Sequence, residues 1–118
     1  MLLNLTTRIC EPDILVIELA GRITLGRESS HLEDAVVKAV LNGSRKIVMN
    51  LAEVHYIDSA GIGIIAFSFG KVTKAGGHFR VAGATGVVKD VFRLTRLDTV
   101  IPFSPTVDVA CAAMAKES

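Results

Sequence analysis

The residues of this chain whose types and spacing could do chemistry gather in one short segment, from Asp58 to Gly63. The segment follows an apolar, strand-like run and opens an apolar pattern at helical spacing, so we expect it at an exposed strand-to-helix corner. There the hydroxyl of Ser59 could cap the helix by accepting a hydrogen bond from a free backbone N–H group. A phosphate on Ser59 would also be tolerated, because helix N-termini offer free donors and the positive end of the helix dipole. Ser59 is therefore a candidate for both a structural cap and a charge switch.

Two catalytic interpretations of this segment fit the sequence less well. Gly61–Ala66 matches the dinucleotide-binding fingerprint G-x-G-x-x-G/A by its letters. The preceding strand, however, is expected to end at Leu51, too far upstream for a tight turn, and no acidic residue follows about 20 positions later to bind a ribose. A hydrolase nucleophile needs the pattern G-x-S-x-G, and Ile57 stands where its first glycine belongs. We therefore expect no catalytic residue and no enzymatic activity, although three histidines are available as bases: His31, His55 and His78.

The rest of the composition argues against metals, nucleic acids and membranes. The histidines and the two cysteines show no metal-ligand spacing, and there is no Walker-type loop. Net charge is +1 and only 5% of the residues are aromatic, so a platform for stacking bases is absent. Cys10 and Cys111 indicate reduced thiols, and no apolar run approaches the roughly 18 residues of a membrane span. Without a signal-like leader, we expect a cytoplasmic protein with no cofactor, no metal and no membrane span.

Positive charge is concentrated in the second half of the chain. Between Ser59 and Leu97, six basic residues stand against Asp90 alone, which gives a local net charge of +5. This excess could mark an acidic partner or a phosphate-bearing surface, whereas scattered, solvated charges are the simpler interpretation. The six are Lys71, Lys74, Arg80, Lys89, Arg93 and Arg96.

The first half of the chain is expected to supply a hairpin, a helix and a strand. Alternating and β-branched residues on either side of a turn at Glu11–Asp13 predict two antiparallel strands. Apolar residues at helical spacing predict the helix, with Asn42-Gly43 at its end and either Ser30 and Glu33 as a capping box at its start or a start one turn earlier. The expected ranges are 3–9 and 14–19 for the hairpin strands, 28–41 for the helix and 45–51 for the third strand.

The second half is expected to alternate helices and strands. The helix that opens at Ser59 has a core-facing stripe, and Ile64 and Phe67 fall on its opposite, outward face. A proline in the final strand predicts an edge position, and Ser104-Pro105 predicts the start of the last helix. The expected ranges are 59–75 for the first helix, 78–82 for a strand, 86–94 for a helix with Val87, Val88, Val91, Phe92 and Leu94 inward, and 100–103 for the last strand.

The order of these elements predicts one α/β domain over residues 1–118. Strands that alternate with helices after a hairpin imply right-handed crossovers and therefore a mixed sheet with a parallel run. A helix that is apolar on two sides is either fully buried or part of an interface, so the outward face of the Ser59 helix predicts a docking site. An ordinary capped helix start is the alternative interpretation of the same residues.

Three motifs resemble one known family. The run Leu51–Gly63 resembles the signature of STAS domains, the family of anti-sigma factor antagonists and of cytosolic domains on sulphate transporters. Val91–Asp98 is similar to a second, weaker signature, and Gly21-Arg22-Ile23 to the close of the early hairpin. The resemblance implies a STAS-type mixed sheet with an N-terminal hairpin and about four helices packed mainly on one side. It also implies that Ser59 is the phosphorylated serine, with a partner-binding surface made by Thr24, Asp58, Ala60, Gly61, Gly63, Ile64, Phe67 and Lys71.

A stand-alone domain of this length resembles the antagonists of the family. The resemblance implies that the unphosphorylated form binds an anti-sigma factor with serine kinase activity and so releases the sigma factor. The kinase would use ATP to phosphorylate Ser59 and end the binding, and a serine phosphatase would restore it. No direct contact with nucleic acid is implied.

The chain departs from the family pattern at three positions. Thr24 and Asn50 stand where many members have an acid, and both positions are expected to lie near Ser59. Arg96 stands where the family often has a helix-ending glycine, a position that would strain a non-glycine residue if it is left-handed. Two other functions remain open: a non-switching STAS scaffold or accessory module of a signalling or transport complex, and a domain that binds a small ligand or nucleotide.

Overall fold

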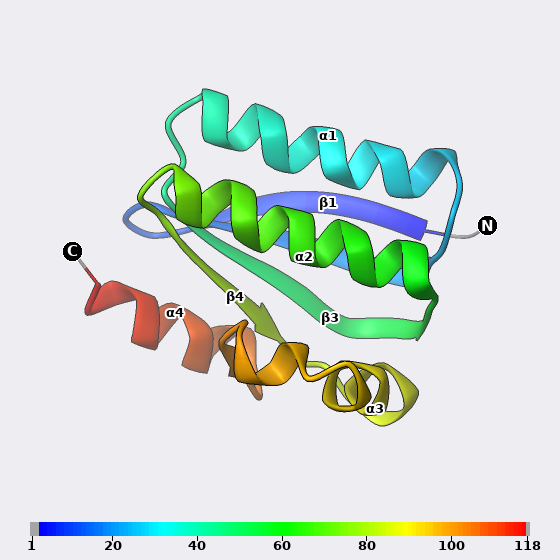
Figure 1. Cartoon of the computed structure of the whole chain (residues 1–118). Coiled ribbons are helices and arrows are strands. Elements are labelled where there is room, and N and C mark those ends of the chain that lie inside the picture. The colour runs from blue at the N-terminus through cyan, green and yellow to red at the C-terminus, as the bar shows by residue number, and fades with distance from the viewer. Residues whose placement is uncertain (1–2, 118) are drawn as a thin grey trace.

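A five-stranded sheet in the order β1-β2-β3-β4-β5 organises the fold (Figure 1). The computed structural model describes residues 3–117. Strands β1 and β2 are antiparallel, and the pairs from β2 to β5 are parallel. The predicted mixed sheet and element order are confirmed. In chain order the elements are β1 (Leu3–Cys10), β2 (Ile14–Ile23), α1 (Arg27–Leu41), β3 (Lys46–Ile57), α2 (Ser59–Lys74), β4 (His78–Ala82), α3 (Gly86–Leu94), the short helix η1 (Leu97–Thr99), β5 (Phe103–Ser104) and α4 (Val107–Ala115).

The strand before the Ser59 segment is longer than the sequence indicates. It was expected to end at Leu51, but β3 continues to Ile57. Two register shifts against β2 each place an extra residue on β3, and such bulges interrupt the alternation of side chains. As a result Leu51, Val54 and Ile57 all face the same core at a spacing of three. A spacing of three does not match the two-residue period of a strand, so the hydrophobic pattern of the sequence does not reveal the last part of β3.

The helices cover the two faces of the sheet unequally. Helices α1 and α2 lie side by side on one face (Figure 1), and α3 adds Val88 and Phe92 to the same core. Only α4, among the helices of residues 3–117, packs on the other face, where Ala110, Cys111 and Met114 meet β2, β3 and β4. The expected packing of helices mainly on one side is thus confirmed. Because α4 follows β5 and α3 follows β4, two neighbouring parallel strands send their helices to opposite faces.

Several local predictions, on the helix starts, the last strand and the inward face of α3, are wrong. Helix α1 begins after Gly26 with no side-chain cap, so Ser30 and Glu33 form no capping box. The last strand is β5 rather than 100–103, and its helix is capped by Thr106, whose hydroxyl accepts a hydrogen bond from the N–H of Val109 at 3.2 Å. On α3 the expected inward residues Val87 and Leu94 are exposed.

The two cysteines, distant in the sequence, meet on the face covered by α4. Cys10 at the end of β1 packs against the cluster that contains Cys111. Burial, together with a side-chain hydrogen bond to Cys10, raises the pKa of the Cys111 thiol to about 11. Both thiols are free. None of the helices in the described part of the chain has the length and hydropathy that crossing a bilayer requires.

Candidate functional site

Asp58 fixes the corner between β3 and α2. Its Oδ1 accepts a hydrogen bond from the N–H of Gly61 at 2.9 Å, and its Oδ2 accepts one from the N–H of Leu25 at 3.1 Å. Its own N–H donates to the carbonyl of Ile23 at 3.2 Å. The hydrogen bond from Gly61, followed by the bond from Leu25, holds the pKa of the Asp58 carboxyl below its usual value. Asp58 therefore joins the end of β2, the loop before α1 and the start of α2.

Ser59 is the first residue of α2 and is exposed. The cap that the sequence offered to Ser59 is made by Asp58 instead, because Asp58 has the extended backbone of an N-cap. Within residues 3–117 the Ser59 hydroxyl makes no hydrogen bond to the protein, and no histidine binds it. The expected exposed serine at a strand-to-helix corner is present, and its oxygen is open to modification.

The two glycines of the motif have different structural roles. A Cβ on Gly61 would lie 2.3 Å from the carbonyl oxygen of Ile23 and 2.7 Å from Cγ1 of Ile57. Gly61 is buried, so it allows the first turn of α2 to pack directly on the ends of β2 and β3. Gly63 is exposed and has open space around the position of a Cβ. Of the two, only Gly63 lies on a surface that a partner could reach.

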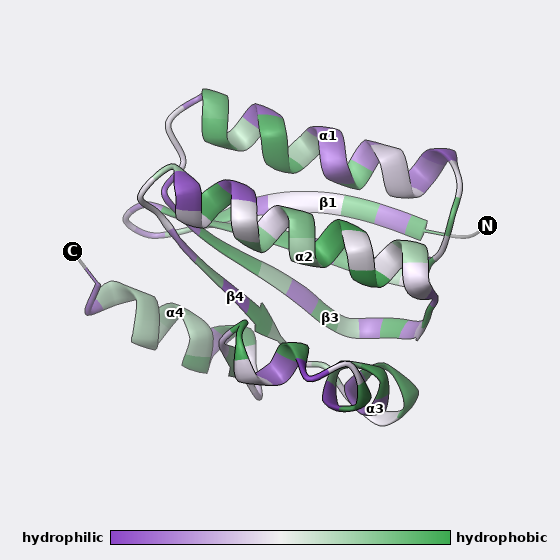
Figure 2. Ribbon diagram, in the orientation of Figure 1, coloured by the Kyte–Doolittle hydropathy of each residue, from purple (hydrophilic) through white to green (hydrophobic). Residues whose placement is uncertain are grey.

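The outward side of α2 carries a stripe of small residues around one aromatic ring. We define the outer stripe as Ala60, Gly63, Phe67, Gly70 and Lys74, which follow one another at steps of three and four residues. Phe67 is 40% exposed, and Gly70 also has open space around it. Figure 2 shows apolar and neutral colours over most of α2, with polar residues at its C-terminal end. Basic residues in the last turn, Lys71 and Lys74, account for that polar end.

Ile64 differs from the predicted outward position. It is half-buried and packs against the main core, whereas Phe67 is exposed as expected. The reason is that α1 packs along α2, so α2 is covered on a flank as well as on the side toward the sheet. Lys71 is also only half-exposed. The exposed surface of α2 is therefore narrower than the sequence pattern suggests.

Thr24 and Asn50 do not share one neighbourhood. Thr24 lies beside Leu25, which Asp58 binds, and its carbonyl accepts a hydrogen bond from the Ser29 hydroxyl. Asn50 instead bonds Glu18, with Nδ2 donating to Oε1 at 2.6 Å, and lines a cavity on the face of the sheet covered by α4. The expectation that Asn50 lies near Ser59 is wrong. Successive residues of a strand face opposite sides of the sheet, and Asn50 faces the side away from α2.

The structure adds two features to the site that the sequence analysis missed. Leu25 is 83% exposed and is held next to Asp58 by its N–H group. Arg22 lies over the ring of Tyr56, with its guanidinium carbon 4.7 Å from the ring centroid. An apolar residue directly before Gly26, in a loop between a strand and a helix, is the signal that could have identified Leu25.

A dinucleotide does not fit this corner, even though β3 does reach it. The expected reason, a strand that ends too early, is wrong because β3 ends at Ile57. The structural reason is that the Asp58 carboxylate already accepts the Gly61 N–H that a pyrophosphate would need. Gly61 itself packs against Ile23 and Ile57. Within the described residues no group of three or more histidines, cysteines and acids could hold a metal ion.

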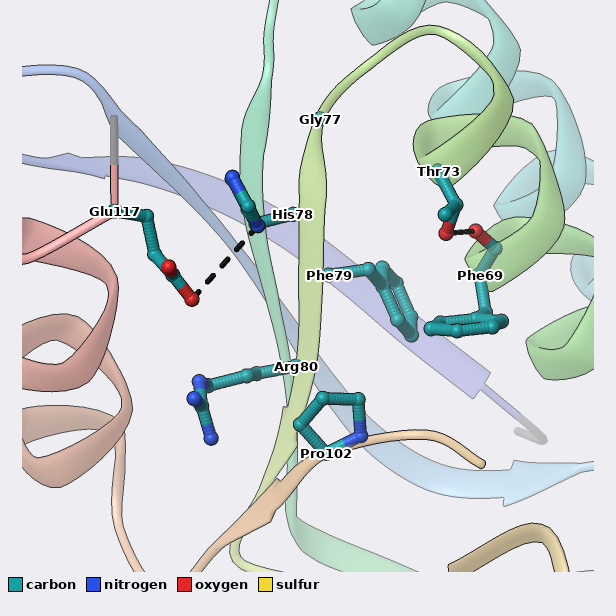
Figure 3. Close-up of a pocket in the computed structure, with 8 residues that line it drawn as sticks. All are labelled: Phe69, Thr73, Gly77, His78, Phe79, Arg80, Pro102 and Glu117. Atoms are coloured by element: carbon teal, nitrogen blue, oxygen red, sulfur yellow. Dashed lines mark hydrogen bonds and ion pairs between the residues drawn. The ribbon is translucent and has the colours of Figure 1, made fainter. Parts of the chain in front are cut away.

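A small cavity lies between α2 and the C-terminal end of the chain, away from the Ser59 corner. Figure 3 shows Phe69 and Phe79 edge to face and His78 beside Glu117. The nearest atoms of that last pair, Nδ1 and Oε1, are 3.8 Å apart. The cavity volume is about 100 Å³. This is below the roughly 300 Å³ of a typical ligand site, so the cavity is too small to be a candidate ligand site.

Comparisons with known proteins agree with this geometry. The sequence model of the STAS domain matches residues 7–110. A candidate anti-sigma factor antagonist of Thermotoga maritima is 31% identical over 97 residues, which are 80% of this chain and 86% of the relative. The crystal structure of an anti-sigma factor antagonist from Mycobacterium paratuberculosis superposes with a TM-score of 0.86 and 25% identity. The match covers 97% of this chain and 95% of the Mycobacterium chain.

The fold is also that of SpoIIAA, an anti-sigma factor antagonist solved in unphosphorylated form and, from Bacillus, in phosphorylated form. The two structures cover 98% and 93% of this chain, and the chain covers 100% and 98% of theirs. Both superpose with a TM-score of 0.74, and their identities are 14% and 16%. At this identity the likeness concerns the fold.

Proposed function

The chain belongs to the STAS domain family and to its anti-sigma factor antagonists, and on this premise we propose that it switches partners through Ser59. In its unphosphorylated form it binds an anti-sigma factor with serine kinase activity, which frees the sigma factor. The kinase transfers the γ-phosphoryl group of ATP to the Ser59 hydroxyl, and the complex separates. A serine phosphatase then returns the chain to its binding form. We place these steps in the cytoplasm, where ATP and sigma factors are available.

The observation that carries the proposal is an unbonded, exposed serine at the head of an exposed apolar stripe. Ser59 directly precedes Ala60, the first residue of the outer stripe, and Leu25 adds an exposed apolar side chain at the same end of α2. Glycines beside Phe67 leave room for a partner's backbone to approach the helix closely. An anchor ring in such a setting is typical of binding hot spots.

A phosphate on Ser59 would oppose this contact through its charge. It adds about −1.5 to −2 charges at neutral pH, directly beside the Asp58 carboxylate. The Asp58 oxygens already accept the N–H groups of Gly61 and Leu25, so two of the nearby backbone donors are occupied. In a complex both negative groups would have to lose water next to an apolar surface, which is costly unless the partner supplies a cation.

The free domain, in contrast, can hold the phosphate in water. Ser59 is exposed, and a negative group at the first residue of a helix interacts favourably with the helix dipole. SpoIIAA, which has the same fold, has been solved in phosphorylated and unphosphorylated forms, and this supports the proposal. Phosphorylation is therefore expected to change binding and to leave the fold intact.

The proposal is tested with Ser59→Ala and Ser59→Asp, titrated calorimetrically against the purified anti-sigma factor. Ser59→Ala should bind at least as tightly as the wild type and remain folded, since Asp58 and not Ser59 caps α2. Ser59→Asp should keep its thermal stability and lose at least about tenfold in affinity. Ser30→Asp is the matched control, because it adds the same charge at an exposed position in the first turn of α1.

Phosphorylation itself is tested by incubation with the kinase and ATP, followed by mapping of the modified residue by mass spectrometry. The phosphate is expected on Ser59, while Ser29 and Ser104 are buried and out of reach. Modification of Ser30 with Ser59 untouched would contradict the proposal. Equal binding by Ser59→Ala and Ser59→Asp would instead favour the non-switching scaffold.

A further inference from the structure

At the carboxyl ends of β4 and β5 the helices that follow these strands leave toward opposite faces of the sheet. The proposed function does not use this part of the fold. After β4 the chain enters α3, whose Val88 and Phe92 join the core under α1 and α2. After β5 it enters α4, which packs on the opposite face of the sheet. Neighbouring parallel strands whose helices leave to opposite faces create a crevice between their ends. In open α/β sheets this is the place where ligands bind.

A cavity of about 440 Å³ occupies this crevice, within the range of roughly 300–1,000 Å³ that small-molecule sites have. One wall is apolar and includes Phe92 and Phe103, whose rings meet edge to face with centroids 5.0 Å apart. Their packing against each other gives this wall a fixed shape. Ala84 also lines the cavity.

The polar groups of the cavity favour a negatively charged ligand. Lys89 and Arg93 approach from α3, and Asp98 is the one acid of the lining, so cations exceed anions. Arg93 already has a partner, since its Nη2 donates to Asp90 at 2.7 Å, whereas no ion pair engages Lys89 within residues 3–117. Lys89 is therefore the cation with the greatest freedom to meet a ligand.

Ser104 lies at the end of β5, where it lines the cavity. Its register partner Ala82 belongs to the core under α4, whereas Val81, the register partner of Phe103, belongs to the main core. The Ser104 side chain therefore faces away from the side of the sheet on which Phe103 and Phe92 lie.

From these observations we propose that the crevice between α3 and β5 binds a small aromatic anion, a ring that carries a carboxylate or a phosphate. The ring lies against Phe103, whose own ring is held in place by the fully buried Phe92. The anionic group meets Lys89. This site is separate from the outer stripe of α2, so it stands whether or not Ser59 is a switch.

The test uses four probes added to the isotope-labelled whole chain and followed by amide chemical shifts. Benzoate and phenyl phosphate each combine a ring with an anionic group, inorganic phosphate lacks the ring, and benzyl alcohol lacks the charge. At least one of the first two should bind with a millimolar Kd, as expected for about ten non-hydrogen atoms, and should shift amides in 84–86, 89–93 and 103–105. Which of the two binds more tightly identifies the anionic group.

Variants link that binding to the proposed contacts. Lys89→Ala should weaken binding of the better probe about fivefold or more. Lys38→Ala removes an exposed lysine from α1, outside the cavity, and should leave the Kd unchanged. Ala84→Leu should abolish binding by filling the cavity.

Three results would overturn the proposal. They are no saturable shift with either anionic ring, equal binding of benzyl alcohol, and equal losses of affinity in Lys89→Ala and Lys38→Ala. The outcome for Ser59 variants has no influence on these measurements, so a failure here is distinguishable from a failure of the partner switch.

Discussion

At the scale of single residues, the backbone conformation of Arg96 and the hydrogen bonds of the Asp58 carboxylate each affect the stability of the fold. Arg96 has φ of 61° and is the one non-glycine residue in residues 3–117 with a left-handed backbone. It follows α3 and precedes η1, the place where the family resemblance indicates a glycine. The position is therefore left-handed, and a side chain with a Cβ is strained there.

Arg96→Gly should therefore raise the free energy of unfolding by up to about 1 kcal/mol, because relief of strain exceeds the extra freedom of glycine in the unfolded chain. Urea denaturation provides the measurement. Arg96→Ala is the control, since it removes the guanidinium and keeps the strain. The strain argument fails if the alanine variant gains as much stability as the glycine variant.

Asp58 should make stability depend on pH at the acidic end. Its pKa is lower in the folded state, mainly through the hydrogen bond from Gly61, than in the unfolded chain. The stabilising effect is therefore complete above the usual aspartate pKa of about 4 and disappears as the pH falls below it.

Asp58→Asn keeps a good N-cap and removes the titration, so its unfolding free energy should change less than that of the wild type between pH 5 and about pH 3. Thermal unfolding across this range measures the difference. Asp58→Ala should in addition lose about 1 kcal/mol at neutral pH. Parallel pH profiles for the wild type and Asp58→Asn would assign the acid sensitivity to other carboxylates.

At the scale of elements, the two apolar side chains of α2 that were predicted to face outward, Ile64 and Phe67, differ in role: one contributes to stability and the other to binding. Phe67 is 40% exposed on the outer stripe, and Ile64 is half-buried against the main core. Residues three positions apart on one helix thus meet different surroundings, since only one of the two packs against the main core.

Phe67→Ala should weaken binding of the anti-sigma factor by about 1–3 kcal/mol and change the stability of the free domain by less than about 0.5 kcal/mol. Ile64→Ala should do the reverse and lower stability by about 1–3 kcal/mol. Calorimetric titration and thermal melting of both variants separate the two effects. A large loss of melting temperature in Phe67→Ala would mean that its ring is a core residue.

At the scale of the whole molecule, the two faces of the sheet have separate tasks. The face under α1 and α2 carries the Ser59 corner, and the face under α4 closes a second core around Met114, which is fully buried. This separation predicts that damage to the α4 face affects stability without affecting the docking surface.

Met114→Ala should lower the free energy of unfolding by about 2–5 kcal/mol through the cavity it leaves. Val109→Ala, at an exposed position on the same helix, should change it by less than about 0.5 kcal/mol. Below their melting temperatures both variants should bind the anti-sigma factor as the wild type does. A loss of affinity in Met114→Ala at a temperature where it is folded would show that the two faces are coupled.

The sequence by itself determined the hairpin, the order of strands and helices, and the Asp58-Ser59 corner. These features follow from periodicity, turn residues and a motif, all of which act within a few positions of the chain. Helix α3 and strand β4 agree with their predicted ranges for the same reason.

Only the tertiary structure decided which neighbours those elements meet. The bulges that carry β3 to Ile57 depend on its register against β2, and the burial of Ile64 depends on how α2 packs on the main core. The choice of Asp58 over Ser59 as the cap depends on the backbone at the end of β3 and on the Leu25 N–H. The position of Asn50, the contact of Cys10 with Cys111 and the crevice between α3 and β5 join residues that are distant in the sequence. Burial and pairing across such distances are properties of the folded chain, because no local pattern of residues encodes which element will lie alongside.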